Sequence, residues 1–466
     1  MGMSLYLKNI LKSFRLPGKI YGYSAQKAID EELKQLAPLL SAFCLREDAD
    51  FLEYRKLKLS RILKYAYRHS RYYRRLFSLY KLDLNNLDNF NKLPILDKRT
   101  IRANRRSIVS DELAHLSYYK VNTGGSTGEP LEFFAANIMV VILAAIQRSF
   151  YEKIMGYRTG DKVAAFAGTS IPEEDLRNHI YWKKCGDDIP FGRLSYSSQH
   201  LTPVTMPYYL EHLFELKPSV FRGYPSFIND IAVYMLKRGI NIPFKIKGIE
   251  LGSENIFDWQ IANIKKAFNC GVFLQYGHTE GCALAHTFDD SFQYQCYPFF
   301  GLVEVLDANG NQVKENEPGE IVVTGFYSFP QPFIRYRTGD MAIFGGEDKG
   351  VVKLNKIIGR TQDFIYTKEK ERIALTALIF GQHFQAFKNI EKWQLVQNTP
   401  GEILIKIVKT KDFNQNDQEE IRNKFKSICN IDPSFEFVDR VLLTKRGKFK
   451  FLIQNFDIVP TQSGSV

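Results

Sequence analysis

Apolar runs and helix-like segments alternate between residues 118 and 276, and this alternation constrains the fold more than any other feature of the sequence. The runs predict strands at 116–119, 163–167 and 272–277, and strands that run into a turn within 220–226 and 249–254. The segments between them predict helices at 137–156, 207–216 and 227–238. Such alternation is typical of a parallel sheet covered by helices. Ligands of these sheets gather at the carboxyl ends of the strands, so the loops after the strands are the first candidates for a site.

The loop after the first of these strands is rich in glycine and hydroxyl side chains. It consists of Thr123, Gly124, Gly125, Ser126, Thr127 and Gly128, followed by Glu129 and Pro130. Glycine permits tight turns and lets backbone N–H groups approach an anion, and the hydroxyls add neutral donors, so the loop can wrap a polyphosphate. It is not a Walker A loop, because Glu129 stands where that motif has lysine. The alternative interpretation is a flexible turn between two strands.

Length and charge limit the class of protein. A chain of 466 residues is too long for one compact core, so two or three domains are expected. The longest apolar run, 138–146, is too short to cross a bilayer. The formal charge of +12 either attracts anionic ligands such as ATP, coenzyme A or a membrane surface, or reflects composition alone. No helix-turn-helix, zinc-finger or RNP-type signature supports a nucleic-acid partner.

The cysteines and the N-terminus indicate the compartment. The six cysteines are scattered and form no C-x-x-C pair, which favours reduced thiols. The N-terminus lacks the basic start, apolar run and small-residue cleavage site of a signal peptide, so we expect a cytoplasmic protein. Cys282, His286 and Cys296 lack a fourth ligand at a familiar spacing, and ordinary buried thiols are favoured over a metal site there.

The predicted secondary structure changes along the chain, and these changes predict the domain organisation. We expect an α/β protein whose N-terminal domain, 1–357, contains a helical opening (1–110), a parallel α/β core (about 111–300) and a β-rich part (about 301–357). A small, mobile α+β domain is expected at 358–466.

Within the helical opening, residues 51–77 carry apolar side chains at helical spacing with basic residues between them. Such a helix can bind an anionic membrane, so peripheral membrane contact is one interpretation. The favoured interpretation is a helix whose aromatic stripe packs on its own domain. The following stretch, 93–98, predicts a loop that enters a helix with Asp97 as its N-cap.

Four further stretches carry groups that suit a nucleotide site: 275–281, 333–340, 359–363 and 444–450. In the first, Glu280 at a strand end can hold Mg2+ against phosphate oxygens, or can be a surface glutamate. In the second, Asp340 can accept both hydroxyls of a ribose, or can close a turn with a nearby arginine. The third can serve as a hinge. The last is, by itself, a solvated basic turn.

Taken in this order, these motifs resemble the adenylate-forming superfamily of acyl-CoA synthetases, and within it the phenylacetate-CoA ligases and the CapK-type proteins of polysaccharide gene clusters. The resemblance covers nearly the whole chain and includes 92–98 and 223–226. It implies an enzyme that uses ATP and Mg2+ to convert a carboxylic acid to an acyl-adenylate and then transfers the acyl group. The expected acceptor is coenzyme A. A homodimer is compatible with it, and the acid is not specified.

The resemblance also implies a role for individual residues. Thr123 to Gly128 correspond to the phosphate loop, and Thr279 and Glu280 to the pair that contacts phosphate and Mg2+. The residues implied in nucleotide binding are Gly252, Ser253 and Glu254 along the adenine, Tyr276 stacked on it with Gly277 and His278 beside it, Asp340 at the ribose and Arg360 next to that aspartate. Lys448 corresponds to the lysine that bridges the carboxylate and the α-phosphate, and Gln362 to the hinge.

Two positions depart from the pattern of the family. Leu131 follows Pro130 where many relatives have lysine, so pyrophosphate contacts are expected to be weaker. Gln362 replaces the commoner Asp or Lys at the hinge. Two alternatives to a coenzyme A ligase stay open: adenylation followed by transfer to an amine or hydroxyl of a sugar, and a nucleotide-binding scaffold without turnover in envelope assembly.

Overall fold

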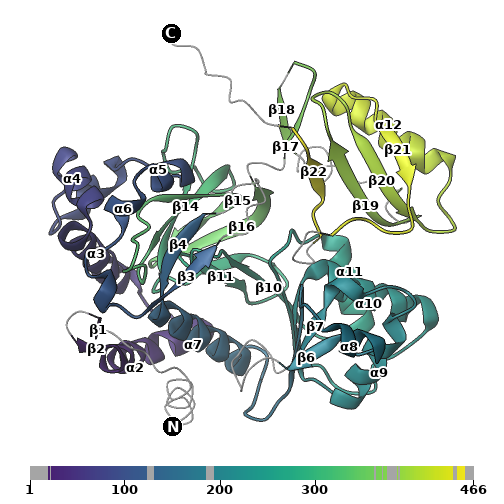
Figure 1. Cartoon of the computed structure of the whole chain (residues 1–466), viewed down its shortest axis with the longest axis horizontal. Helices are drawn as coiled ribbons and strands as arrows, with labels where there is room; N and C mark the ends of the chain where they lie inside the picture. Colours follow the sequence, from purple (N-terminus) through teal and green to yellow (C-terminus); the bar gives the residue numbers. More distant parts are fainter. Residues whose placement is uncertain are drawn as a thin grey trace. The chain divides into compact units, whose positions relative to one another are not determined.

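The computed structural model describes residues 19–20, 23–122, 131–184, 194–360, 364–369, 371–374, 386, 389–443 and 449–456. Its contacts divide the chain into two compact units, Met1–Ile358 and Gly359–Val466. The first unit contains a large mixed sheet with helices around it, and the second contains a small sheet with one long helix (Figure 1).

The first unit is built on a 12-stranded sheet in the order β13-β14-β15-β16-β12-β11-β10-β9-β8-β5-β7-β6. Its parallel half consists of β7 (Leu194–Ser197), β5 (Val163–Ala167), β8 (Val220–Gly223), β9 (Gly248–Gly252) and β10 (Val272–Gly277). β6 (Trp182–Lys184) closes this edge in antiparallel pairing. The α/β class and the parallel core predicted from the alternating pattern are confirmed.

The other half of the same sheet is antiparallel. It contains β11 (Leu284–Thr287), β12 (Tyr294–Cys296), β13 (Gly301–Leu306), β14 (Pro318–Gly325), β15 (Tyr336–Asp348) and β16 (Val351–Arg360). We expected the strands after residue 300 to form a β-rich part of their own. Instead β16 pairs with β12, which joins them to the core in one continuous sheet.

The first expected strand lies outside this sheet. β3 (Tyr118–Asn122) pairs antiparallel with β4 (Glu132–Ala136) in a separate two-stranded sheet. The prediction that this strand belongs to the parallel alternation was therefore wrong. The reason is the strand β4, which follows so closely along the chain that a hairpin forms. The stretch 220–226 was expected to be a strand that runs into a turn before a helix at 227–238. The strand ends at Gly223, and the helix begins two residues earlier than expected because Pro225 takes its first position.

Helices cover the sheet in the way its apolar strands require. β5 is buried over nearly its whole length, which is typical of a strand covered on both faces. The covering helices include α7 (Asn137–Lys153), α9 (Met206–Leu216), α10 (Pro225–Arg238) and α11 (Asp258–Phe268), and a short exposed helix, α8 (Glu173–Arg177), lies between β5 and β6 in the chain. Helix α7 is apolar on most of its surface because α2 (Ala25–Cys44) packs along it (Figure 1).

The described part of the opening is mostly helical from Ala25 onward, after a short pair of strands at Lys19–Ile20 and Tyr23–Ser24. It contains α3 (Leu52–His69), α4 (Arg71–Leu79), α5 (Lys98–Ala103) and α6 (Arg105–Ile108), together with the 3-10 helices η1 (Leu87–Lys92) and η2 (Leu113–His115). The Asp97 carboxylate accepts from the Thr100 N–H at 2.7 Å, which confirms the predicted N-cap of α5. Helix α3 buries Leu59, Ile62 and Leu63, as the packed interpretation requires. Among the described residues, no helix is both long and apolar enough to cross a membrane.

The second unit is a small α+β fold. A hairpin of β17 (Phe364–Tyr366) and β18 (Arg372–Ala374) precedes a four-stranded sheet in the order β21-β20-β19-β22. These strands are β21 (Ser434–Phe437), β20 (Leu404–Lys409), β19 (Ile390–Gln397) and β22 (Leu452–Gln454). Helix α12 (Gln415–Cys429) begins at the cap Asn414 and lies beside this sheet (Figure 1).

Candidate active site

The carboxyl ends of the neighbouring strands β9 and β10 carry two of the sequence-predicted groups. The strands pair in parallel with Gly252 opposite Gln275, so the turn at 252–254 and the loop after Tyr276 leave the same edge of the sheet. The turn is held by Glu254, whose Oε2 accepts from the Ser226 N–H at 3.2 Å, at the N-terminus of α10. A carboxylate is favourable there because the helix dipole places partial positive charge at that end.

Tyr276 and Asp340 lie 64 positions apart in sequence but touch in the fold. The Tyr276 hydroxyl donates to Asp340 Oδ2 at 3.0 Å. Burial and the adjacent carboxylate both raise the pKa of Tyr276 well above its usual value, so the hydroxyl keeps its proton and acts as a donor. Asp340 is half-buried on β15, where its own N–H donates to Thr338 Oγ1 at 3.0 Å. The two residues predicted to bind adenine and ribose are therefore joined by a hydrogen bond.

Glu280 is a buried carboxylate held by two side chains. Only 7% of the residue is exposed, yet both of its oxygens have donors. The Tyr336 hydroxyl donates to Oε1 at 2.7 Å, and His278 Nδ1 lies 3.0 Å from Oε2. Burial raises the pKa of Glu280, but hydrogen bonding and charge from His278, followed by the Tyr336 hydroxyl, outweigh it and lower that pKa to about 2. Glu280 is thus a fixed negative charge at neutral pH.

The loop around Glu280 packs tightly against α7. Gly281 adopts φ +65°, and a Cβ at this position would lie 1.9 Å from the Met139 sulfur, so another residue would strain the backbone and displace the Met139 side chain. Thr279 is exposed at the surface of this loop. His278 Nε2 is buried, and it has no hydrogen-bond partner among the residues that the structure describes.

Several predicted site residues lie outside the described part of the chain. These are Thr123, Gly124, Gly125, Ser126, Thr127, Gly128, Gln362 and Lys448. Arg360 ends strand β16, and its side chain is likewise not described. The structure therefore brings together the strand-end residues of β9 and β10 with Asp340 of β15, and the phosphate loop and the lysine stay predictions.

The arginines of the stretch 333–340 have other partners than the turn interpretation proposed. Arg335 is buried and its guanidinium lies 3.0 Å from Glu304 Oε1 on β13, while Arg337 lies 2.8 Å from Glu320 on β14. Tyr336 lies between these two arginines in the sequence and was missed by sequence reasoning. Its hydroxyl donates to Glu280. Its position inside an otherwise charged run, Arg-Tyr-Arg, was the one available signal, but only the fold shows what it touches.

A second buried carboxylate, Glu250 on β9, was also missed. Its Oε1 accepts from Gln147 and lies 2.9 Å from His286 Nε2, and its Oε2 accepts from the Tyr151 hydroxyl at 2.9 Å. Burial raises its pKa, but Arg222, whose Nε lies 3.6 Å away, and then His286 lower it to about 2. Gln147 also accepts from Gln275 at 3.0 Å, so this network ties α7 to the two strands that end in the site.

His286 thus has a structural role. Its Nδ1 lies 3.0 Å from the Tyr297 hydroxyl, and its ring stacks on Phe150. Cys282 and Cys296 are buried free thiols. Within the described ranges, no group of three or more His, Cys, Asp or Glu side chains could hold a metal ion. The burial of the two thiols and the hydrogen bonds of His286 are those of ordinary core residues.

A magnesium ion bound through phosphate oxygens fits Glu280 nonetheless. Mg2+ in nucleotide sites keeps several waters and takes only one or two carboxylates, so it does not need a cage of protein ligands. Each Glu280 oxygen has one assigned donor and a second lone pair, and the low pKa keeps the group charged.

The chain was compared with known proteins. Residues 365–455 match the family of the CapK C-terminal domain. Protein CapK of Staphylococcus aureus is 28% identical over 421 residues, which is 88% of this chain and 91% of CapK. Phenylacetate-coenzyme A ligase of Pseudomonas putida is 24% identical over 325 residues, 65% of this chain and 69% of that protein.

Solved structures show the same fold. Two structures of 2-hydroxyisobutyryl-CoA ligase in the postadenylation state, each with an acyl-AMP, superpose with TM-scores of 0.64 and 0.65 at 17% identity. Each covers 86% of this chain and 89% of the ligase. At this identity the likeness establishes the fold, an N-terminal α/β region followed by a small C-terminal domain. The comparisons therefore agree with the resemblance seen in the sequence: the C-terminal part matches a CapK family domain, and the chain is similar over most of its length to CapK and to phenylacetate-CoA ligase.

Proposed function

We propose that this protein activates a carboxylic acid with ATP, forms an acyl-adenylate and releases pyrophosphate, and then transfers the acyl group to coenzyme A. The observation that supports it best is the pairing of Tyr276 with Asp340, beside the buried anion Glu280 in the loop that follows the strand of Tyr276. This arrangement combines an aromatic ring, a ribose acceptor and a magnesium ligand at the carboxyl edge of a parallel sheet, where such folds bind nucleotides.

Each of these residues has a defined task in this proposal. The Tyr276 ring packs against adenine, while its hydroxyl holds the Asp340 carboxylate in place to accept from the ribose hydroxyls. Tyr336 and His278 keep Glu280 charged and oriented, so that it can hold Mg2+, which when bound neutralises phosphate charge. Because Glu280 is fixed before the substrate arrives, little reorganisation is needed when charge develops.

The remaining tasks fall to residues known only from the resemblance. The N–H groups and hydroxyls of 123–128 bind the β- and γ-phosphates, and the ammonium of Lys448 lies between the carboxylate and the α-phosphate. The carboxylate oxygen attacks the α-phosphorus and pyrophosphate leaves. The acceptor then attacks the acyl carbon, and AMP leaves with that oxygen. No side-chain nucleophile takes part.

Exchange of labelled pyrophosphate into ATP, screened over aryl, fatty, hydroxy and amino acids, tests the first half of this proposal. One or more acids should support exchange, and no exchange with any acid in a protein that binds ATP would favour a scaffold. Product analysis with and without coenzyme A tests the second half. An acyl-CoA is expected, whereas an acylated sugar formed without coenzyme A would establish the other acceptor and place the reaction in surface-polysaccharide synthesis.

A further inference from the structure

The helices α4, α5 and α6 share an unusual charge distribution. Every charged side chain that they carry is basic: Arg71, Arg74 and Arg75 on α4, Lys98, Arg99 and Arg102 on α5, and Arg105 and Arg106 on α6. The three helices lie side by side at one edge of the first unit (Figure 1). We call their exposed side the basic face. A surface of one sign attracts ligands of the other.

Helix α4 is fixed so that one side points outward. Its inner side buries Tyr73 and Phe77, and the Tyr73 hydroxyl donates to the Pro332 carbonyl at 2.9 Å. Residues four apart lie on the same side of a helix, so Arg71, Arg75 and Leu79 form a row opposite that inner side. All three are exposed, Leu79 to 75%. Tyr80, which follows the helix, is 40% exposed.

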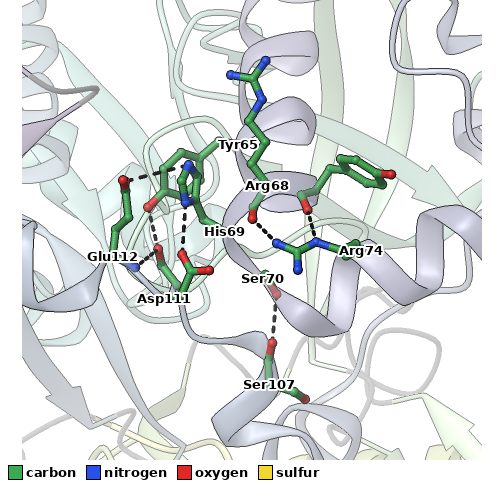
Figure 2. Close-up of polar contacts among 10 residues, drawn as sticks. Tyr65, Arg68, His69, Ser70, Arg74, Ser107, Asp111 and Glu112 are labelled. Atoms are coloured by element: carbon green, nitrogen blue, oxygen red, sulfur yellow. Dashed lines mark hydrogen bonds and ion pairs between the residues drawn. The ribbon is translucent and has the colours of Figure 1, made fainter.

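The corner between α3 and α4 holds this row in position, and its contacts show which charged groups are already engaged (Figure 2). The Ser70 hydroxyl donates to the Ser107 carbonyl at 3.0 Å, which fastens α4 to α6. The Arg74 guanidinium folds back on carbonyls at the end of α3 (Figure 2). His69 lies 3.0 Å from Asp111 and 3.9 Å from Glu112, so the nearby acids have a partner of their own.

Only some of the other arginines of the basic face are engaged. Arg105 is paired with Glu132. Arg71, Arg75, Arg99 and Arg106 are exposed, and within the part of the chain that the structure describes they have no carboxylate partner. Unpaired arginines at the surface are available for phosphate groups, which they bind with two parallel hydrogen bonds.

We propose that the basic face docks this protein on the surface of a membrane rich in anionic phospholipids. The arginines pair with lipid phosphates, and Leu79 and Tyr80 enter the boundary between headgroups and acyl chains. An acidic protein would also satisfy the arginines, but it would not require an exposed leucine and tyrosine at the end of the row. Apolar side chains among basic ones are typical of helices that lie in a membrane interface.

Flotation with vesicles tests this proposal on the full chain. Vesicles of phosphatidylglycerol and phosphatidylcholine should carry the protein at low salt, and vesicles of phosphatidylcholine alone should not. Each arginine near an anionic surface contributes about fivefold to partitioning, so Arg71→Glu with Arg75→Glu should lower it at least about 25-fold. Leu79→Ser should weaken binding without a change of charge. High salt should release the protein, because it screens the attraction.

A control variant changes the net charge of the protein by the same amount as Arg71→Glu with Arg75→Glu. Lys245→Glu with Lys266→Glu alters two exposed lysines elsewhere in the first unit and should leave vesicle binding within about twofold of wild type. Wild-type protein that stays unbound to anionic vesicles overturns the proposal, as does an equal loss in both double variants. An Arg71→Glu, Arg75→Glu variant that binds as wild type also overturns it. If Leu79→Ser binds as wild type, the insertion of Leu79 is overturned and the arginines alone account for the binding to vesicles.

Discussion

Replacing Glu280 with glutamine changes one charge in the candidate site and little else. Glutamine has the same shape, and its carbonyl oxygen can still accept from the Tyr336 hydroxyl, which lies 2.7 Å from Glu280 Oε1 in the native protein. The neutral amide cannot supply the negative charge that would hold a phosphate-bound Mg2+. The change therefore separates the charge of this residue from its packing.

The pKa of Glu280 sets the size of the effect on stability. It falls from 4.5 to about 2 in the folded protein, which corresponds to about 3 kcal/mol in favour of the ionised form. Because the folded pKa is the lower one, this contribution is present above about pH 4.5 and is lost as the pH falls toward 2. The difference in unfolding free energy between wild type and Glu280→Gln should therefore shrink as the pH falls from 5.

The main effect of Glu280→Gln should be on the rate of pyrophosphate exchange, and the protein should stay folded. Loss of a preorganised charge at a reacting phosphate lowers rates by about 100- to 1,000-fold. The assay is pyrophosphate exchange at pH 7, beside urea unfolding at pH 7, 5 and 4. Glu304→Gln is the control, because Glu304 is a partly buried carboxylate on β13 that pairs with Arg335 at 3.0 Å, away from the proposed chemistry.

The control should lose stability but keep exchange within about threefold, as expected for a residue outside the catalytic machinery. The reasoning fails if Glu280→Gln keeps exchange within threefold of wild type. It also fails if Glu304→Gln loses exchange to the same extent, because both losses would then reflect damage to the fold.

The other predictions concern the nucleotide and the reacting carboxylate. Asp340→Ala should raise the KM for ATP far more than the KM for the acid. The loss of two buried hydrogen bonds to the ribose corresponds to about 2–4 kcal/mol in ATP binding. Equal rises of both KM values would indicate structural damage. Tyr276→Phe removes the donor 3.0 Å from Asp340 and should raise the KM for ATP about tenfold, which steady-state kinetics measures. Lys448→Ala should abolish pyrophosphate exchange while ATP binding and the unfolding midpoint stay unchanged; exchange within a few-fold of wild type would contradict the role of Lys448.

The sequence predicted what depends on local pattern. The strands β5, β8, β9 and β10 were found because apolar runs mark buried parallel strands, and the Asp97 cap was found from its position before a helix. The hairpin of β3 was not anticipated, because an apolar run shows that a strand exists but not which strand it pairs with.

Contacts between distant residues could not be predicted in this way. Tyr336 lies 56 positions from Glu280, and Glu250 lies 103 positions from Gln147, so no local pattern connects them. Sequence motifs did identify Tyr276, Glu280 and Asp340 as candidates. They could not show that the first and last of these share a hydrogen bond, because that depends on the order of strands in the sheet.

The fate of one oxygen atom tests the central claim most directly. An acid that supports pyrophosphate exchange is supplied with ¹⁸O in its carboxylate, together with ATP and coenzyme A, and the AMP is analysed by mass spectrometry. If the carboxylate attacks the α-phosphorus, one ¹⁸O moves to AMP when the acyl group leaves. AMP that carries one ¹⁸O is the predicted result. Unlabelled AMP, or ADP as the product, would contradict an acyl-adenylate.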